Sequence, residues 1–243
     1  MDSILPVDIF LKSEQKPDRE ITSHWPSNAS IIVDGKVIGS CLRKQYYTWT
    51  KEPKTNPLDT KSFFNFHMGH HFEEMYEGGL KVLGVEYKRE HPVKLDVGLK
   101  YPLSGKIDFL IKEGDKWNAV ELKTSFGRGI SIVKKAGLPK EPYMLQMLCY
   151  LSYCDPKIDV CYNPTIARDS YYRLEFKAWL EDNKLIVNGQ EIPYTMAGII
   201  ERWKQLEDYL EKKELPPRDF KEEKKYPCSY CAYRTKCFER GGE

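Results

Sequence analysis

The chain of 243 residues is predicted to fold as a mixed α/β domain, with a mixed central β-sheet flanked by helices. Three observations lead to this prediction. A helical pattern precedes three strand-like runs, an apolar helical pattern follows them, and two further strand-like runs come before a last amphipathic helix. No internal repeat or low-complexity linker interrupts this order, so a single structural unit is expected.

Within that unit we expect three parts. Residues 1–38 form an N-terminal arm, because the first 30 residues are polar and contain several prolines. Residues 39–220 form the core. Residues 221–243 form a C-terminal segment that carries three cysteines and folds back onto the core.

The N-terminal half of the core is predicted from its start signals and periodicity. A short helix is expected from residue 38 to about 49, and a longer one at 61–83 after the Asp59-Thr60 start signal. Strands are expected at 86–97, 105–112 and 116–124. The last two strands form a hairpin through the turn KEGD.

The C-terminal half begins with a glycine- and lysine-rich loop at 125–140. The run EPYMLQMLCYLSYC has proline near its start and strong helix formers after it, which predicts a helix. Strands follow at 159–167 and 170–177. The last helix, in YTMAGIIERWKQLEDYLEKKEL, is ended by Pro216 and Pro217.

Composition excludes some classes of function. Lysine and arginine number 38 against 36 aspartates and glutamates, so a nucleic-acid partner requires a local basic patch. The apolar runs are far shorter than the roughly 20 residues that a membrane helix needs. The acidic N-terminus does not resemble a secretion signal. We therefore expect a cytoplasmic protein in a reducing compartment that does not bind membranes.

Charged residues stand at the ends of the predicted hairpin strands. Asp108 lies in one strand and Glu121 in its partner, while Lys123 follows two residues later on the same face. Hard divalent cations prefer carboxylate oxygens, and the carbonyl of Leu122 offers a further ligand. An ammonium beside such an ion can orient water or stabilise phosphate charge. The alternative is an ordinary surface hairpin with a cross-strand salt bridge.

Two helices add candidate residues. Gly69, Glu73 and Glu77 fall at four-residue intervals on one face of the helix before the strands, with His70 alongside. Glu73 and His70 are candidates for another metal ligand. Gln146 and Tyr150 also stand four residues apart, on the helix after the strands, where they would brace the site or meet a nucleic-acid backbone.

In this order the motifs G-x-x-x-E, strand aspartate, E-x-K and Q-x-x-x-Y resemble the RecB-like branch of the PD-(D/E)XK nucleases over residues 39–238. The resemblance implies Asp108 and Glu121 as ligands of Mg²⁺ or Mn²⁺ and Lys123 as the catalytic lysine. It implies Gln146 and Tyr150 as the helix motif. The position of Glu73 is usually histidine in this branch, so whether Glu73 or His70 reaches the ion stays open.

Four cysteines form a second motif. Cys41 stands alone, and Cys228, Cys231 and Cys237 follow in CSYCAYRTKC. Four thiolates satisfy one iron-sulfur cluster or one structural zinc ion. The arrangement resembles iron-sulfur members of the RecB-like nucleases, including AddB and CRISPR-associated nucleases, which implies that these four cysteines bind a 4Fe-4S cluster. Zinc, or buried cysteines without metal, are the alternatives. The other three cysteines, Cys149, Cys154 and Cys161, are predicted to lie in the core.

Basic and aromatic residues flank these cysteines. Arg43 and Lys44 follow Cys41, and lysines, an arginine and tyrosines surround the C-terminal three. Such a groove suits single-stranded DNA through phosphate contacts and base stacking. Arg128 would extend it past the hairpin, with Tyr150 as a further contact.

Together these features predict a metal-dependent DNA nuclease that acts on single strands or frayed ends. We expect an exonuclease, and endonuclease activity is an additional possibility that the sequence leaves open. The resemblance is strongest to stand-alone CRISPR-associated or phage-encoded members, with CRISPR integrase or recombination proteins as candidate partners. Two alternatives are a non-catalytic iron-sulfur module that binds DNA ends and a zinc-stabilised accessory protein.

Overall fold

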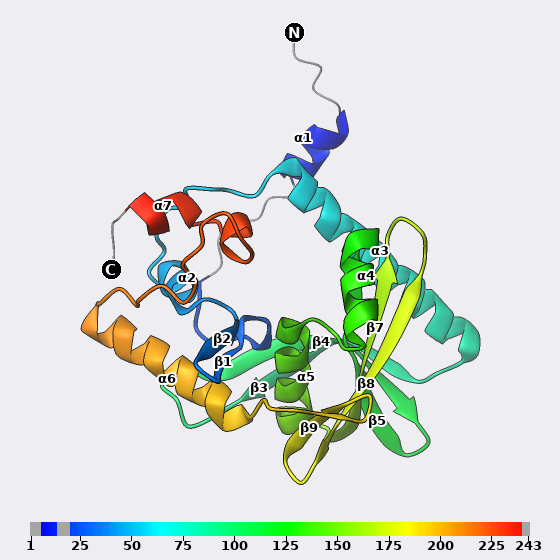
Figure 1. The fold of residues 1–243 in the computed structure, drawn as a ribbon. Coiled ribbons are helices and arrows are strands. Elements are labelled where there is room, and N and C mark those ends of the chain that lie inside the picture. Colours follow the sequence, from blue (N-terminus) through cyan, green and yellow to red (C-terminus); the bar gives the residue numbers. More distant parts are fainter. Residues whose placement is uncertain (1–5, 14–19, 240–243) are drawn as a thin grey trace.

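The computed structural model describes residues 6–13 and 20–239 (Figure 1). Its centre is an eight-stranded sheet in the order β10-β9-β8-β7-β5-β4-β3, with β6 beside β7, and a small sheet pairs β1 with β2. The strands are β1 Ser30–Val33, β2 Lys36–Gly39, β3 Tyr87–Leu95, β4 Leu103–Glu113, β5 Lys116–Val120, β6 Lys123–Ser125, β7 Ile158–Ala167, β8 Arg173–Glu181, β9 Lys184–Val187 and β10 Gln190–Ile192.

Helices cover both faces of the large sheet (Figure 1). They are α1 Pro6–Ser13, α2 Leu42–Trp49, α3 Thr60–Leu83, α4 Gly127–Ala136, α5 Glu141–Tyr153, α6 Met196–Lys212 and α7 Arg234–Glu239, with 3-10 turns η1 Pro26–Asn28 and η2 Cys228–Tyr230. The mixed α/β architecture with a central sheet confirms the predicted fold class. None of the helices in the described ranges is long and apolar enough to cross a bilayer.

Alternation along β5 separates the two hydrophobic cores. Ala119 belongs to the main core, which includes most of α5, whereas its neighbour Val120 packs with Leu80 of α3 and Phe109 of β4. Successive residues of a strand point to opposite faces, so α5 and α3 enclose the sheet from its two sides. The four-strand region β3–β4–β5–β7 is therefore held between two long helices.

The helix α3 follows its predicted limits because both of its ends are capped. Asp59 accepts a hydrogen bond from the backbone N–H of Ser62, and the left-handed residue Gly84 ends the helix. The predicted helices α2, α5 and α6 and the hairpin β4–β5 are also present. Cys149, Cys154 and Cys161 are buried, which confirms their place in the core.

The predicted N-terminal arm is a packed part of the domain wherever residues 1–38 are described. Residues 6–13 form α1, which lies against α3, and the turn Asp34-Gly35 joins the hairpin β1–β2. His24 is buried and stacks on Trp203 of α6, with ring centroids 5.2 Å apart. Residues 1–5 and 14–19 of the predicted arm lie outside the described residues.

Two further predictions were wrong. The expected loop at 125–140 contains α4, because Ile130 and Val133 form a buried apolar face that outweighs the two glycines in its first turn. The strands β9 and β10 after β8 were not predicted, although Asn188-Gly189 is a typical hairpin turn between them.

The described part of the C-terminal segment, residues 221–239, packs against the region around α2. Backbone and side-chain hydrogen bonds join Asn56 to Ala232 and Thr235, and Lys236 pairs with Glu52. A small core that includes Leu42, Tyr47, Leu206 and Tyr233 fills the space between α2, α6 and the segment. The described C-terminal residues are therefore fixed to the start of the core.

We predict that Gly39→Ala destabilises the protein more than Gly35→Ala. Both glycines have positive φ angles, +92° and +72°, which cost an alanine about 1–2 kcal/mol. A Cβ at Gly39 would also lie 2.3 Å from the Ala29 carbonyl oxygen and 2.7 Å from Leu145 Cδ1, whereas a Cβ at Gly35 meets open space. Urea unfolding should show a loss of about 3–5 kcal/mol for Gly39→Ala. Equal losses for the two variants would contradict the close packing of β2 on α5.

Candidate functional site

The sheet opens on both sides of Asp108. The β3–β4 pairing runs through Arg89–Phe109 and His91–Ile107, but Glu90, opposite Asp108, is not paired and has a φ of 49°. The β4–β5 ladder ends at Phe109–Val120, so Glu121 lies opposite Asp108 beyond its last pair. Asp108 therefore lacks a backbone-paired neighbour on both sides, on β3 and on the strand that contains Glu121.

The interruption after β5 is built by specific hydrogen bonds. The backbone N–H of Leu122 donates to Asp108 Oδ2 at 2.8 Å instead of continuing the ladder. The backbone N–H of Glu121 donates to the Tyr162 carbonyl at 2.9 Å, and Asn163 Nδ2 donates to the Glu121 carbonyl at 2.7 Å. These bonds hold Asp108 and Glu121, called the carboxylate pair below, side by side.

Glu121 is almost completely buried, with 2% of its surface exposed. Its Oε1 accepts a hydrogen bond from Lys123 Nζ. The hydroxyl of the neighbouring Tyr150 donates to the Lys106 carbonyl. The other carboxylate oxygen, Oε2, is buried and has no hydrogen-bond partner among the described residues. A buried, unpaired carboxylate oxygen carries a desolvation cost that a bound cation would remove.

The carboxylate pair has perturbed acidity. Burial, reinforced by the charge of Glu121, raises the pKa of Asp108 to about 8, and burial also raises the pKa of Glu121. Burial alone would lower the pKa of Lys123, but the charges of Glu121 and Asp108 outweigh it and raise that pKa. Two acidic groups and one ammonium in a buried setting are typical of a site that works on charged groups.

The residues fit a hard divalent cation through this pair. Such a cation prefers carboxylate oxygens as ligands, and Glu121 Oε2 has no hydrogen-bond partner among the described residues that would compete with an ion. No group of three His, Cys, Asp or Glu side chains within residues 6–13 and 20–239 is arranged to hold a metal ion. The side chain that would be the third, Glu73, lies within electrostatic range of both carboxylates but faces other partners.

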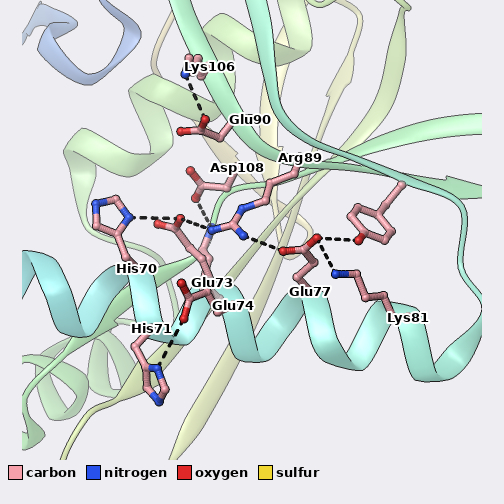
Figure 2. Close-up of polar contacts among 12 residues, drawn as sticks. His70, His71, Glu73, Glu74, Glu77, Lys81, Arg89, Glu90, Lys106 and Asp108 are labelled. Carbon is pink, nitrogen blue, oxygen red and sulfur yellow. Dashed lines mark hydrogen bonds and ion pairs between the residues drawn. The ribbon is translucent and has the colours of Figure 1, made fainter.

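Figure 2 shows these partners of Glu73 on α3. Its carboxylate lies 3.8 Å from the guanidinium of Arg89 and 3.5 Å from His70 Nδ1. The side chain of His70 is 69% exposed, so it sits at the outer rim. Burial is the main cause of the raised pKa values of Asp108 and Glu121, and the charge of Glu73 adds to both, so Glu73 lies within electrostatic range of the carboxylate pair.

One turn further along α3, Glu77 belongs to a separate network (Figure 2). It accepts hydrogen bonds from Tyr87 Oη at 2.7 Å and Arg89 at 2.6 Å, and Lys81 Nζ lies 3.0 Å away. The hydrogen bond from Tyr87 and the cations lower the pKa of Glu77 to about 2. Glu77 is therefore engaged with β3 and serves to fix Arg89.

Gln146 and Tyr150 brace the hairpin from α5. Gln146 Nε2 donates to Tyr150 Oη at 2.9 Å, and Tyr150 Oη donates to the Lys106 carbonyl on β4 at 2.8 Å. Tyr150 is 1% exposed, so its burial argues against the predicted direct contact with nucleic acid. The pair instead anchors β4 two residues before Asp108.

The four predicted cysteine ligands, Cys41, Cys228, Cys231 and Cys237, line one cavity of about 200 Å³, which is called the cysteine cavity below. Burial raises the pKa of Cys41 to about 12 and, with the neighbouring Cys231 and Cys237, also raises that of Cys228. The family resemblance predicted these four as one ligand set. All four line this cavity, but no three of them are arranged to hold a metal ion in the described part of the chain.

Arg43 belongs to this cavity's surroundings. It is 3% exposed, its Nε donates to the Pro216 carbonyl at 2.6 Å, and its Nη1 lies 4.0 Å from Cys237 Sγ. Burial therefore argues against the predicted contact of Arg43 with nucleic acid and favours a role beside the thiols. Lys44 and Arg128, the other predicted contacts, are exposed.

Sequence reasoning missed three residues near the carboxylate pair. Asn163 is fully buried and holds the Glu121 carbonyl, and its signal is a polar residue at an inward position of β7. The Tyr143 ring lies 5.2 Å from Lys123 Nζ. Arg168, directly after β7, bonds Thr124 beside Lys123. No local pattern marks the last two, because their neighbours come from distant segments.

Comparison with curated proteins finds no match. Among solved structures, "Crystal structure of SSO0001" is 18% identical with a TM-score of 0.55, covering 97% of this chain and 95% of that one, which supports the same fold. "Crystal Structure of LHK-Exo in complex with dAMP" is 14% identical with a TM-score of 0.49, covering 71% of this chain and 78% of that one. An alkaline exonuclease from Laribacter hongkongensis is 17% identical with a TM-score of 0.39, covering 61% and 68%.

Comparison of the sequence with protein-family models identifies the family. A family model described as the PD-(D/E)XK nuclease superfamily matches residues 47–238. The matched range contains the carboxylate pair, Lys123 and the α5 pair of Gln146 and Tyr150. The chain belongs to the PD-(D/E)XK nuclease superfamily.

Proposed function

We propose that this nuclease hydrolyses phosphodiester bonds of DNA with a divalent metal ion, as an exonuclease acting on single strands or frayed ends. The observation that carries the proposal is the opening of the sheet around Asp108. There, the buried carboxylate of Glu121, with an unpaired oxygen, and the half-buried carboxylate of Asp108 stand beside a lysine. Membership of the superfamily supports nuclease chemistry at this place.

Asp108 and Glu121 would hold Mg²⁺ or Mn²⁺, with the Leu122 carbonyl and Glu73 or His70 as further ligands. When bound, such an ion polarises the phosphate and lowers the pKa of its bound water. Lys123 is held by Glu121 and directs its ammonium toward the carboxylate pair, where it would orient the attacking water or stabilise phosphate charge. Gln146, Tyr150 and Asn163 position β4 and Glu121 from the protein side.

We further propose a 4Fe-4S cluster on Cys41, Cys228, Cys231 and Cys237. Four thiols around a cavity of about 200 Å³ suit a cluster of several atoms better than one zinc ion, whose four ligands converge on a single point. The guanidinium of Arg43 beside Cys237 would offset part of the thiolate charge. The cluster would join two ends of the core and stabilise a segment that is poor in apolar residues.

A second candidate is a non-catalytic module that binds DNA ends. This candidate is favoured by the ion pairs of Glu73 with Arg89 and His70, because they engage the Glu73 carboxylate that would otherwise be available to bind a metal ion. A cytoplasmic role in CRISPR adaptation or in phage DNA processing, with integrase or recombination proteins as partners, is part of the proposal for either candidate.

We predict that Lys123→Ala lowers the rate of cleavage about 10²–10³-fold, because it removes a charge from the site where negative charge develops. The measurement is degradation of a labelled single-stranded oligonucleotide with Mn²⁺. Lys116→Ala is the matched control, since Lys116 lies on the same hairpin but is 72% exposed and pairs with Asp159. Cleavage should be unchanged in the control. Equal binding with no cleavage by the wild type would favour the non-catalytic module.

Metal binding is predicted to raise the melting temperature of the wild type but not of Asp108→Asn. At a Mn²⁺ concentration of about 100 times Kd, binding stabilises by about 2.7 kcal/mol, roughly 5–10 °C for a chain of this length. In EDTA, Asp108→Asn should melt no lower than the wild type, because it removes one of two adjacent buried acidic groups. Scanning calorimetry with and without Mn²⁺ measures both effects. An equal Mn²⁺ shift in both proteins would show that the ion binds elsewhere.

For the cysteine cavity, we expect anaerobically purified protein to contain iron and acid-labile sulfide and to absorb visible light. Cys231→Ser should lose the iron, the sulfide and the visible absorption, whereas Cys149→Ser, in the core, should keep all three. Stoichiometric zinc without sulfide in the wild type would replace the cluster by a zinc site.

A further inference from the structure

Arg168 lies directly after β7, the strand that pairs with β6, which carries the candidate catalytic lysine Lys123. In the parallel pairing of β6 with β7, Lys123 is opposite Thr165 and Ser125 is opposite Ala167. Arg168 follows directly, and its backbone N–H donates to the Ser125 carbonyl at 2.9 Å. Its position relative to Lys123 is therefore fixed by the sheet itself.

Among the described residues, the partners that hold the guanidinium of Arg168 are neutral groups. Its Nε donates to Thr124 Oγ1 at 2.9 Å, and its Nη1 donates to Asn65 Oδ1 on α3 at 2.6 Å. It also lies over the ring of Phe126, 5.2 Å from the centroid. No carboxylate of the described ranges forms an ion pair with it. Its charge is therefore oriented but not neutralised, which is typical of a guanidinium that receives an anion.

A second unneutralised cation lies nearby. Lys140 Nζ is 5.9 Å from the centroid of the Tyr143 ring, and Lys123 Nζ is 5.2 Å from the same ring. A Cβ on Gly129 would lie 2.0 Å from Ser125 Oγ and 3.8 Å from Lys140 Nζ, so Lys140 lies near Ser125, whose carbonyl accepts the hydrogen bond from the Arg168 backbone N–H. Lys123 pairs with Glu121, whereas Lys140 has no ion pair within the part of the chain that the structure describes.

We infer that Arg168 and Lys140 form a subsite for a backbone phosphate of single-stranded DNA, next to the phosphate that is cleaved at the carboxylate pair. This inference rests on the proposed function and extends it to the path of the strand. The guanidinium fork suits a phosphate, and Phe126, 44% exposed, offers its ring to an unpaired base.

The test is the binding of a fluorescent single-stranded oligonucleotide to the full-length protein in EDTA, at several salt concentrations. Arg168→Gln and Lys140→Gln should each weaken binding about tenfold and lower the slope of log K against log salt by about 0.7, the value for one lost phosphate contact on a single strand. Lys212→Gln makes the same charge change at the end of α6, far from α4 (Figure 1), and should alter neither value.

Two further variants separate binding from folding. Asn65→Ala removes a hydrogen bond of Arg168 but keeps its charge, so the salt slope should stay unchanged. Arg168→Lys keeps the charge and should restore the slope that Arg168→Gln loses. If Arg168→Gln and Asn65→Ala weaken binding equally with the wild-type slope, Arg168 is structural and the subsite is overturned.

The remaining outcomes are also decisive. Absence of oligonucleotide binding by the wild type overturns the subsite, as does an unchanged affinity in Arg168→Gln. A duplex of the same sequence that binds with equal affinity and equal dependence on Arg168 overturns the preference for a single strand. If the variants behave as expected but the wild type does not cleave with Mn²⁺, the subsite stands and the nuclease mechanism fails.

Discussion

The candidate site depends on the hydrogen bond from the Leu122 N–H to Asp108 Oδ2. It ends the β4–β5 ladder where Glu121 stands, so the strand leaves β4 and continues as β6 beside β7. The same departure frees the Glu121 carbonyl for Asn163 and turns its carboxylate toward Asp108. A continuous ladder at this point would have used these backbone groups for strand pairing.

Holding two acids together in a buried place is costly, and the surrounding contacts offset the cost. Lys123 supplies a positive charge to Glu121, and α5 anchors β4 through Tyr150 and the Lys106 carbonyl. From the other face of the sheet, Arg89 links α3 to β3 through Glu77 and Glu73. Because these contacts come from helices on both faces of the sheet, the geometry of the carboxylate pair depends on the packing of both helical layers against the sheet.

Local signals predicted much of this arrangement. Strand alternation predicted the hairpin of Asp108 and Glu121, and the Asp59 cap predicted the start of α3, because both effects act between residues close in sequence. The helix α4 was not predicted, since its stability comes from burying Ile130 and Val133. The break between β5 and β6 and the position of Arg168 also depend on contacts with distant strands, which no window of sequence reveals.

The distribution of charge explains why a net charge of +2 gives no hint of a DNA surface. Many basic residues are paired or buried in the protein: Lys123 with Glu121, Arg89 with Glu77, and Arg43 beside Cys237. The cations left without an acidic partner in the described chain include Arg168 and Lys140, which both lie near Ser125, two residues after Lys123. A short unneutralised stretch beside acidic groups attracts a phosphate and places it near them, whereas a uniformly basic surface would bind phosphates without placing any.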